Sequence, residues 1–313
     1  MEKKSRREFF ARGAAAVWAF GALRASAAER KFTIAFTPGS IGIQADQRRS
    51  IELAAKYGYG SVQPFADDLA KLSDSELGEL RDELRQKNLV WAAAGLPVDF
   101  RRDAALFEEG MAKLPAAAKA YERAGVDRMG TYMMPIHAEL TYLENFKQTA
   151  QRLSRIAAIC GDHGLRLGLE YVGTPSILVR GRYPFVHTMA ETKELIAETG
   201  KSNVGFVLDT WHWWTAGDKV EDLLTLSNAD IISADLNDAP KGLKMIEQQD
   251  GSRELPAATG VIDVKAFLDA LVKIGYDGPI RPEPFNKPLN DMDDEQAAAN
   301  AAAAMKRAFA MVG

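Results

Sequence analysis

The chain has 313 residues, with 39 basic residues against 43 acidic residues and a formal net charge of −4. An acidic balance repels phosphate backbones, so it disfavours nucleic acid as a partner. The one cysteine, Cys160, excludes a disulfide within the chain, and its apolar position in a helical pattern is typical of a small core residue.

The first 27 residues have the layout of an export signal. Arg6 and Arg7 stand in a Ser-Arg-Arg-Glu-Phe-Phe string, followed by an apolar stretch and the small residues Ala25-Ser-Ala27. We predict a twin-arginine signal over residues 1–27, a mature domain over 28–313 and a periplasmic location; an amphipathic first helix is the alternative. Removing the signal lowers the net charge to −8, and no later segment is apolar enough for membrane insertion.

Short apolar or β-branched runs alternate with amphipathic helical stretches along the mature chain. Glycines at 58, 125, 164 and 275 end helices, and Asp263 is placed to cap one. This order predicts a single (β/α)8 TIM barrel. An open doubly wound sheet is the alternative, weakened because no Gly-x-Gly-x-x-Gly follows the first strand. The predicted strands are 32–36, 61–64, 89–93, 127–130, 166–171, 204–208, 230–234 and 279–283.

Four successive predicted strands each end on a carboxylate. These residues are Glu170, Asp209, Asp235 and Glu283. Carboxyl ends of barrel strands share one rim, and buried like charges need a compensating cation. An all-oxygen set suits Mn²⁺ or Mg²⁺ better than Zn²⁺. A single such acid could equally be a salt-bridge partner at the rim, and Asp238 is placed to cap the turn that follows or to support the ligands.

The stretch 168–285 contains a set of short strings around these carboxylates. They are Leu-Glu170-Tyr-Val-Gly, Leu-Asp209-Thr-Trp-His212-Trp, Leu-Asn237-Asp238-Ala-Pro, Arg253-Glu-Leu-Pro256 and Gly275-Tyr-Asp-Gly278-Pro with Glu283-Pro-Phe. With these strings the stretch resembles the xylose-isomerase-like superfamily of metal-dependent barrels, the sugar phosphate isomerase/epimerase group. The resemblance implies that Glu170, Asp209 and Glu283 bind the metal and that Glu170 and Glu283 act as acid and base. It also implies that His212 and Arg253 contact substrate oxygens.

The chain departs from this family at two positions. Members usually have histidine where this chain has Asp235, and many have glutamate where it has Gln63. A neutral amide can bind a hydroxyl group but cannot take a proton. The first departure keeps an oxygen ligand and makes the site more anionic.

Further substrate-binding residues are predicted from their places after strands. Trp211 could stack on a sugar ring, and His137 and His187 follow the fourth and fifth strands. The alternatives are a plain core tryptophan and surface histidines.

These features predict an isomerase or epimerase that acts on a small-molecule sugar or polyol with one divalent cation, Mn²⁺ being favoured and Mg²⁺ or Zn²⁺ being open. The cation would stabilise an enediolate while carboxylates move the proton. A 3-keto-glycoside lyase or hydratase with the same site and a non-catalytic sugar-binding barrel are the alternatives. A DNA-repair nuclease is disfavoured by four histidines in total and by the negative charge. A homo-oligomer is left open.

Overall fold

The computed structural model describes residues 30–313, so the predicted signal at 1–27 lies outside the described residues. Parallel pairings join nine strand segments in the order β3-β2-β1-β11-β10-β9-β7-β5-β4. Because β3 and β4 belong to one short stretch, residues 90–95, the sheet returns to where it began and closes. The segments are β1 (Thr33–Phe36), β2 (Ser61–Val62), β3 (Val90–Trp91), β4 (Ala94–Gly95), β5 (Arg128–Tyr132), β7 (Arg166–Glu170), β9 (Val204–Asp209), β10 (Ile231–Leu236) and β11 (Pro279–Pro282).

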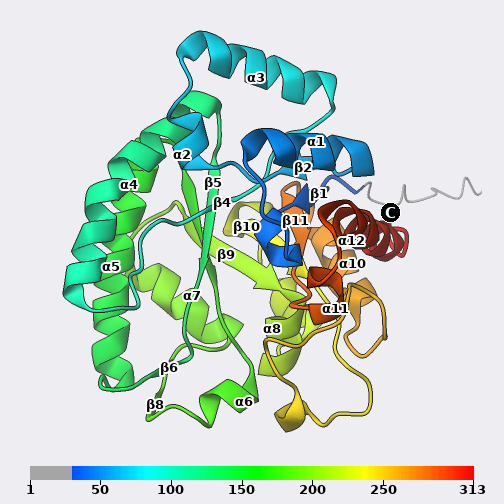
Figure 1. Ribbon diagram of the computed structural model, residues 1–313. Helices are drawn as coiled ribbons and strands as arrows, with labels where there is room; N and C mark the ends of the chain where they lie inside the picture. Colours follow the sequence, from blue (N-terminus) through cyan, green and yellow to red (C-terminus); the bar gives the residue numbers. More distant parts are fainter. Residues whose placement is uncertain (1–29) are drawn as a thin grey trace, which may run out of the picture.

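The predicted (β/α)8 barrel is therefore confirmed, and each of its eight predicted strands overlaps a strand of the structure. A small antiparallel pair, β6 (Ile136–His137) with β8 (Tyr183–Pro184), was not predicted. It joins the loops that follow β5 and β7, near α6 (Pro175–Leu178). Figure 1 shows this pair well away from the central strands.

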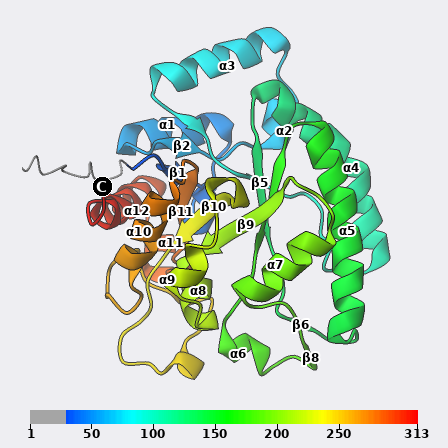
Figure 2. The ribbon, with the colours of Figure 1, turned by 180° about the vertical axis from the view of Figure 1, so that it is seen from behind.

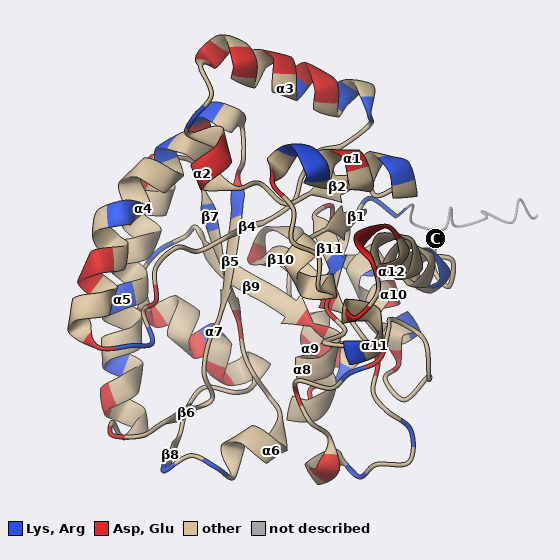
Figure 3. Cartoon of the chain, viewed as in Figure 1, with Lys and Arg blue, Asp and Glu red and all other residues tan. Residues whose placement is uncertain are grey.

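Helices surround the strands in both views (Figures 1 and 2). Lys, Arg, Asp and Glu lie mostly along these helices and the loops, whereas most of the strand surface is uncharged (Figure 3). None of the helices in the described part is long and apolar enough to cross a membrane. The remaining elements are η1 (Pro38–Ile41), α1 (Gln47–Tyr57), α2 (Ala66–Leu69), α3 (Asp74–Gln86), α4 (Ala104–Ala124), α5 (Tyr142–Asp162), α7 (Met189–Glu198), α8 (Thr210–Ala216), α9 (Val220–Leu223), η2 (Asn228–Asp230), η3 (Met245–Glu247), α10 (Val264–Ile274), α11 (Lys287–Asn290) and α12 (Asp294–Phe309).

The local signals in the sequence explain where the helices begin and end. Gly58, Gly125 and Gly275 follow α1, α4 and α10 with φ values of 72°, 80° and 76°, a left-handed conformation that costs glycine least. The side chain of Asp263 accepts a hydrogen bond from the Ala266 N–H at the start of α10. These predicted boundaries are confirmed.

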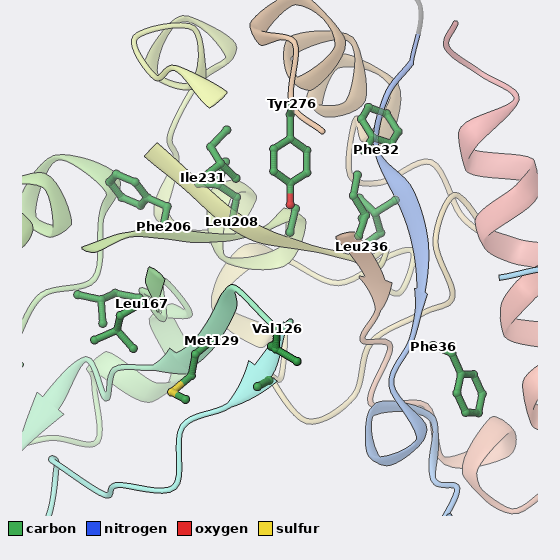
Figure 4. Close-up of a cluster of buried hydrophobic side chains, with 14 of the residues drawn as sticks. Phe32, Phe36, Val126, Met129, Leu167, Phe206, Leu208, Ile231, Leu236 and Tyr276 are labelled. Carbon is green, nitrogen blue, oxygen red and sulfur yellow. The ribbon is translucent and has the colours of Figure 1, made fainter. Parts of the chain in front are cut away.

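The core lies between the strands and the helices. Phe32, Phe36, Phe206 and Tyr276 are among the buried side chains drawn in Figure 4. Cys160 is fully buried on α5, and this burial raises the pKa of its thiol to about 12. A thiol that stays protonated and out of reach of solvent behaves as a small apolar group, as the sequence predicted.

Candidate active site

The four predicted carboxylates come together at the carboxyl ends of the strands. Glu170 and Asp209 are the last residues of β7 and β9, Asp235 lies in β10, and Glu283 follows β11 directly. One carboxylate oxygen of each lies within 4.8 Å of the others, and all four side chains are buried. Parallel strands that are neighbours in a barrel end at the same rim, which is why residues far apart in the chain meet here.

A guanidinium group stands among these carboxylates. Arg281 on β11 is the register partner of Asp235 on β10, so the two side chains lie on the same side of the sheet. Its Nε and Nη2 donate to the two oxygens of Asp235 at 2.7 and 2.8 Å. The same Nη2 donates to Oε1 of Glu283 at 2.6 Å. Such a bidentate, charge-assisted pair is among the stronger polar contacts in proteins.

A second guanidinium, that of Arg253, is placed by the long loop after β10. Its Nη1 donates to Oδ2 of Asp209 at 2.8 Å and to Oε2 of Glu283 at 3.3 Å. Its Nη2 donates to Oδ1 of Asp250 at 2.8 Å and lies 3.2 Å from Nε2 of His212. The group is almost fully buried, so these acceptors hold it in one position.

A cavity of about 580 Å³ opens over this cluster. Glu170, Glu283, Arg253, Arg281 and His212 line it. The other two carboxylates of the cluster are buried behind the arginines and do not line the cavity. With Asp250, which also lines the cavity, three carboxyl groups and two guanidinium groups face one space, whose size suits a small ligand.

Burial dominates the ionisation of the residues that face the cavity. It raises the pKa of Glu170 well above its ordinary value, with the charges of Glu283 and Asp209 adding to the effect. Burial also raises the pKa of Glu283 to about 8, although Arg281 opposes it. It lowers the pKa of the His212 imidazole to about 4, so the ring is neutral near pH 7.

Asp209 differs from the two glutamates. Burial alone would raise its pKa, but the nearby Arg253, His212 and the amide of Asn237 together lower it to about 2. Its Oδ1 accepts hydrogen bonds from the Trp211 N–H at 2.6 Å and from Nδ2 of Asn237 at 2.9 Å. Asp209 is thus ionised at all ordinary pH values and serves as a fixed counter-charge for Arg253.

The hydrogen bonds do not fit a divalent cation bound by all four carboxylates. Both oxygens of Asp235 accept from Arg281, both oxygens of Glu283 accept from the two arginines, and both oxygens of Asp209 are also hydrogen-bonded. Of these four carboxylates in the described residues, Glu170 is the one with a buried oxygen, Oε1, that has no hydrogen-bond partner. Asp235 and Glu283 both accept hydrogen bonds from Nη2 of Arg281. A cation bound to the same carboxylate oxygens would be repelled by the positive charge of Arg281 at close range.

The other predicted substrate-binding residues divide into two groups. Gln63 lines the cavity, as do His212 and Arg253. Trp211 is fully buried, its Nε1 donates to Oγ1 of Thr174 at 2.9 Å, and its ring lies under the Arg253 guanidinium at 5.2 Å. Its predicted role in stacking on the sugar is therefore corrected: it supports Arg253.

The two predicted histidines also lie elsewhere. Nδ1 of His137 accepts from the N–H groups of Glu139 and Leu140 and so fixes the turn after β6. Nδ1 of His187 lies 2.7 Å from the Phe185 carbonyl oxygen, at the start of α7. Neither histidine lines the cavity, so the structure does not bring them to the carboxylates, and their contact with substrate stays a prediction.

Reasoning from the sequence missed three residues of the site: Arg281, Asp250 and Asn237. Arg281 could have been found, because it stands two residues before Glu283 and side chains alternate along a strand. Nothing in the local sequence marks Asp250, which lies in an irregular loop. Asp238, predicted as a cap or support, binds four backbone N–H groups of its own loop instead of the ligands.

Residues 51–308 match the family described as xylose isomerase-like TIM barrel, and the chain belongs to this family. It is 25% identical to the inosose isomerase of Bacillus velezensis over 76% of this chain and 83% of the relative. A xylose isomerase domain protein from Alicyclobacillus acidocaldarius has 27% identity and a TM-score of 0.77, over 90% of this chain and 99% of that chain. The IOLI protein, solved with a bound zinc atom, shares the fold at 20% identity and a TM-score of 0.74, over 90% and 99% of the two chains.

Proposed function

We propose that the protein isomerises or epimerises a small keto-sugar or keto-inositol by moving a proton on a carbon next to a carbonyl group. One observation carries this proposal: Glu170 and Glu283 face the same cavity from strands β7 and β11, each with a raised pKa. Carboxyl groups whose pKa lies near the working pH are suited to general acid–base catalysis. The kinship with an inosose isomerase supports the same class of substrate.

We assign the two carboxyl groups the roles of base and acid. Glu283, with a pKa of about 8, is partly ionised near neutral pH and can take the proton as its carboxylate. Burial and the charges of Glu283 and Asp209 raise the pKa of Glu170 well above its ordinary value, which favours its carboxylic acid form as the group that delivers a proton to the neighbouring carbon or the opposite face. His212, being neutral, and Gln63 can bind substrate hydroxyl groups.

Exchange of solvent deuterium into the substrate tests the proposal directly. Keto-sugars and keto-inositols are incubated with the protein in D₂O, and incorporation is followed by NMR. We expect exchange with at least one of them and a loss of about 10²–10⁴-fold in Glu283→Gln and in Glu170→Gln, the range of a general acid or base. Glu295→Gln, which alters an acid on α12, is the control and should retain exchange.

A second outcome is elimination of a β-substituent from the same enediolate, which would make the protein a keto-glycoside lyase or hydratase. Product analysis in the same reactions separates the two: isomerisation conserves the substrate mass, whereas elimination releases a fragment or water. A barrel that binds the sugar without exchange or product in any reaction would fit a sugar-binding role.

We also propose that the enzyme acts in the periplasm after export by the twin-arginine route. The support for this is the sequence alone, in the pattern around Arg6 and Arg7.

A further inference from the structure

The position of Arg281 distinguishes this site from one in which four carboxylates coordinate a metal ion. Nη2 of Arg281 lies within 2.8 Å of one carboxylate oxygen of Asp235 and one of Glu283. A cation that binds these two oxygens would compete with it. Asp235 is fully buried and Arg281 covers it, with 30% of the arginine side chain exposed towards the cavity. The guanidinium therefore stands between the innermost carboxylate and the cavity.

The three nitrogens of the Arg281 guanidinium differ in their hydrogen bonds. Nε and Nη2 are both engaged by carboxylates. Nη1 makes no hydrogen bond to any residue of the described chain, 30–313, and Arg281 lines the cavity. Arg253, by contrast, uses all three of its nitrogens on Asp209, Asp250 and Glu283. Arg281 thus keeps one charged donor free for a substrate oxygen, and an arginine is always charged.

We propose that the guanidinium of Arg281, held by Asp235 and Glu283, takes the place of a divalent cation, so that the site needs no metal to polarise the substrate carbonyl. The residue that resembles a metal ligand, Asp235, is then an anchor for the arginine. This deepens the proposed function, because it names the electrophile for the same proton transfer.

The chemical step balances without a further reactant. The Glu283 carboxylate takes the proton from the carbon next to the carbonyl, and the C–H electrons form the carbon–carbon double bond of an enediolate. The carbonyl oxygen becomes negative and accepts the hydrogen bond from Nη1 of Arg281. In epimerisation the carboxylic acid of Glu170 then gives its proton to the same carbon from the opposite face, the double-bond electrons form the new C–H bond, and the negative oxygen becomes the carbonyl oxygen again. In isomerisation the proton goes to the former carbonyl carbon, and the hydroxyl proton of the enediolate passes to the negative oxygen as the new carbonyl forms. A fixed charged donor at a developing oxyanion is a large source of rate acceleration.

Metal content is the first test. The wild-type chain is produced with Mn²⁺, Mg²⁺ and Zn²⁺ supplied, and bound metal is measured by plasma mass spectrometry. We expect substoichiometric metal, a melting temperature that EDTA does not change, and deuterium exchange that EDTA does not reduce. One tightly bound ion per chain, with EDTA lowering both melting temperature and exchange, would overturn the proposal.

Variants of Arg281 and of its anchor Asp235 provide the second test. In Arg281→Ala the carboxylates lose their counter-charge, so we expect affinity for Mn²⁺ to rise at least about tenfold, the scale on which one adjacent charge shifts an ionic equilibrium. Exchange without metal should fall about 10²–10³-fold, as for loss of one oxyanion donor. The double variant Arg281→Ala with Asp235→His should bind metal in stoichiometric amounts. Arg182→Ala, which removes an exposed arginine from the loop after β7, is the matched control and should change neither property.

The two hypotheses fail in different ways. Absence of exchange in the wild-type chain, with and without added metal, would refute the proposed function, whereas the metal content still decides the role of Arg281. Exchange that appears only with added Mn²⁺ would refute the role of Arg281 and leave the proposed function standing. Should Arg281→Ala not fold, Arg281→Lys keeps the charge but not the bidentate contact, and we expect weakened metal-free exchange from it.

Discussion

Asp238 holds the loop that carries Arg253, and replacing it should destabilise the protein measurably. Its Oδ1 accepts from the N–H groups of Ala239 and Ile262 at 2.8 and 3.0 Å, and its Oδ2 accepts from those of Thr259 and Gly260 at 2.8 and 2.7 Å. Ala239 and Ile262 are buried, whereas Gly260 is exposed and Thr259 is half-buried. Two donors would therefore be left without a partner and two would be rehydrated in Asp238→Ala.

The magnitude follows from that division. A buried donor left unpaired costs about 1–3 kcal/mol and a lost hydrogen bond that water replaces costs about 1 kcal/mol, so Asp238→Ala should lower the free energy of unfolding by about 4–8 kcal/mol. Asp238→Asn keeps one oxygen acceptor for the buried pair and loses the acceptor of the other two donors, so it should cost about 2 kcal/mol. Asp263→Ala is the control, because Asp263 caps α10 through one exposed hydrogen bond and should cost about 1 kcal/mol.

Urea denaturation at pH 7, followed by circular dichroism, measures these differences as shifts of the midpoint at an unchanged slope. The expected order of destabilisation is Asp238→Ala, then Asp238→Asn, then Asp263→Ala. If Asp238→Ala were no less stable than the Asp263→Ala control, the four hydrogen bonds would not hold the loop and the reasoning would be refuted.

Four further predictions concern the site and the signal. The rate of deuterium exchange into the substrate should rise with pH and level off above about 8, because Glu283 must lose its proton to act as a base. The Glu283→Gln variant should lack this rise. Because ionising the buried Glu283 is unfavourable, the free energy of unfolding should fall as pH rises from about 4.5 to about 8, and less so in Glu283→Gln, as pH-dependent denaturation would show. Trp211→Phe should cost about 1 kcal/mol for the lost hydrogen bond to Thr174, with KM little changed; a large rise in KM would restore Trp211 as a substrate contact. Replacing Arg6 and Arg7 by Lys should leave an uncleaved precursor in the cytoplasm, and normal periplasmic accumulation on immunoblots would contradict the twin-arginine assignment.

The strands, the helix ends and the four carboxylates could be predicted from the sequence because each depends on local signals. A run of apolar residues that ends in Glu170 or Asp209 indicates a buried strand and the position of its carboxyl end, without any information from the rest of the chain. The repeated order of strand and helix then leaves few topologies, of which the closed barrel is one. The charge, the single cysteine and the family strings also needed no coordinates.

The partners of those carboxylates were decided by the tertiary structure. The register between β10 and β11 puts Arg281 opposite Asp235, and a loop without regular structure brings Asp250 and Arg253 under the cavity. The burial that raises the pKa of Glu283 and the charge of Arg253 that lowers the pKa of Asp209 likewise depend on contacts between distant parts of the chain. A sequence lists charges one at a time, but whether a cluster of acids binds a metal ion or an arginine depends on which neighbour the fold places within hydrogen-bond distance.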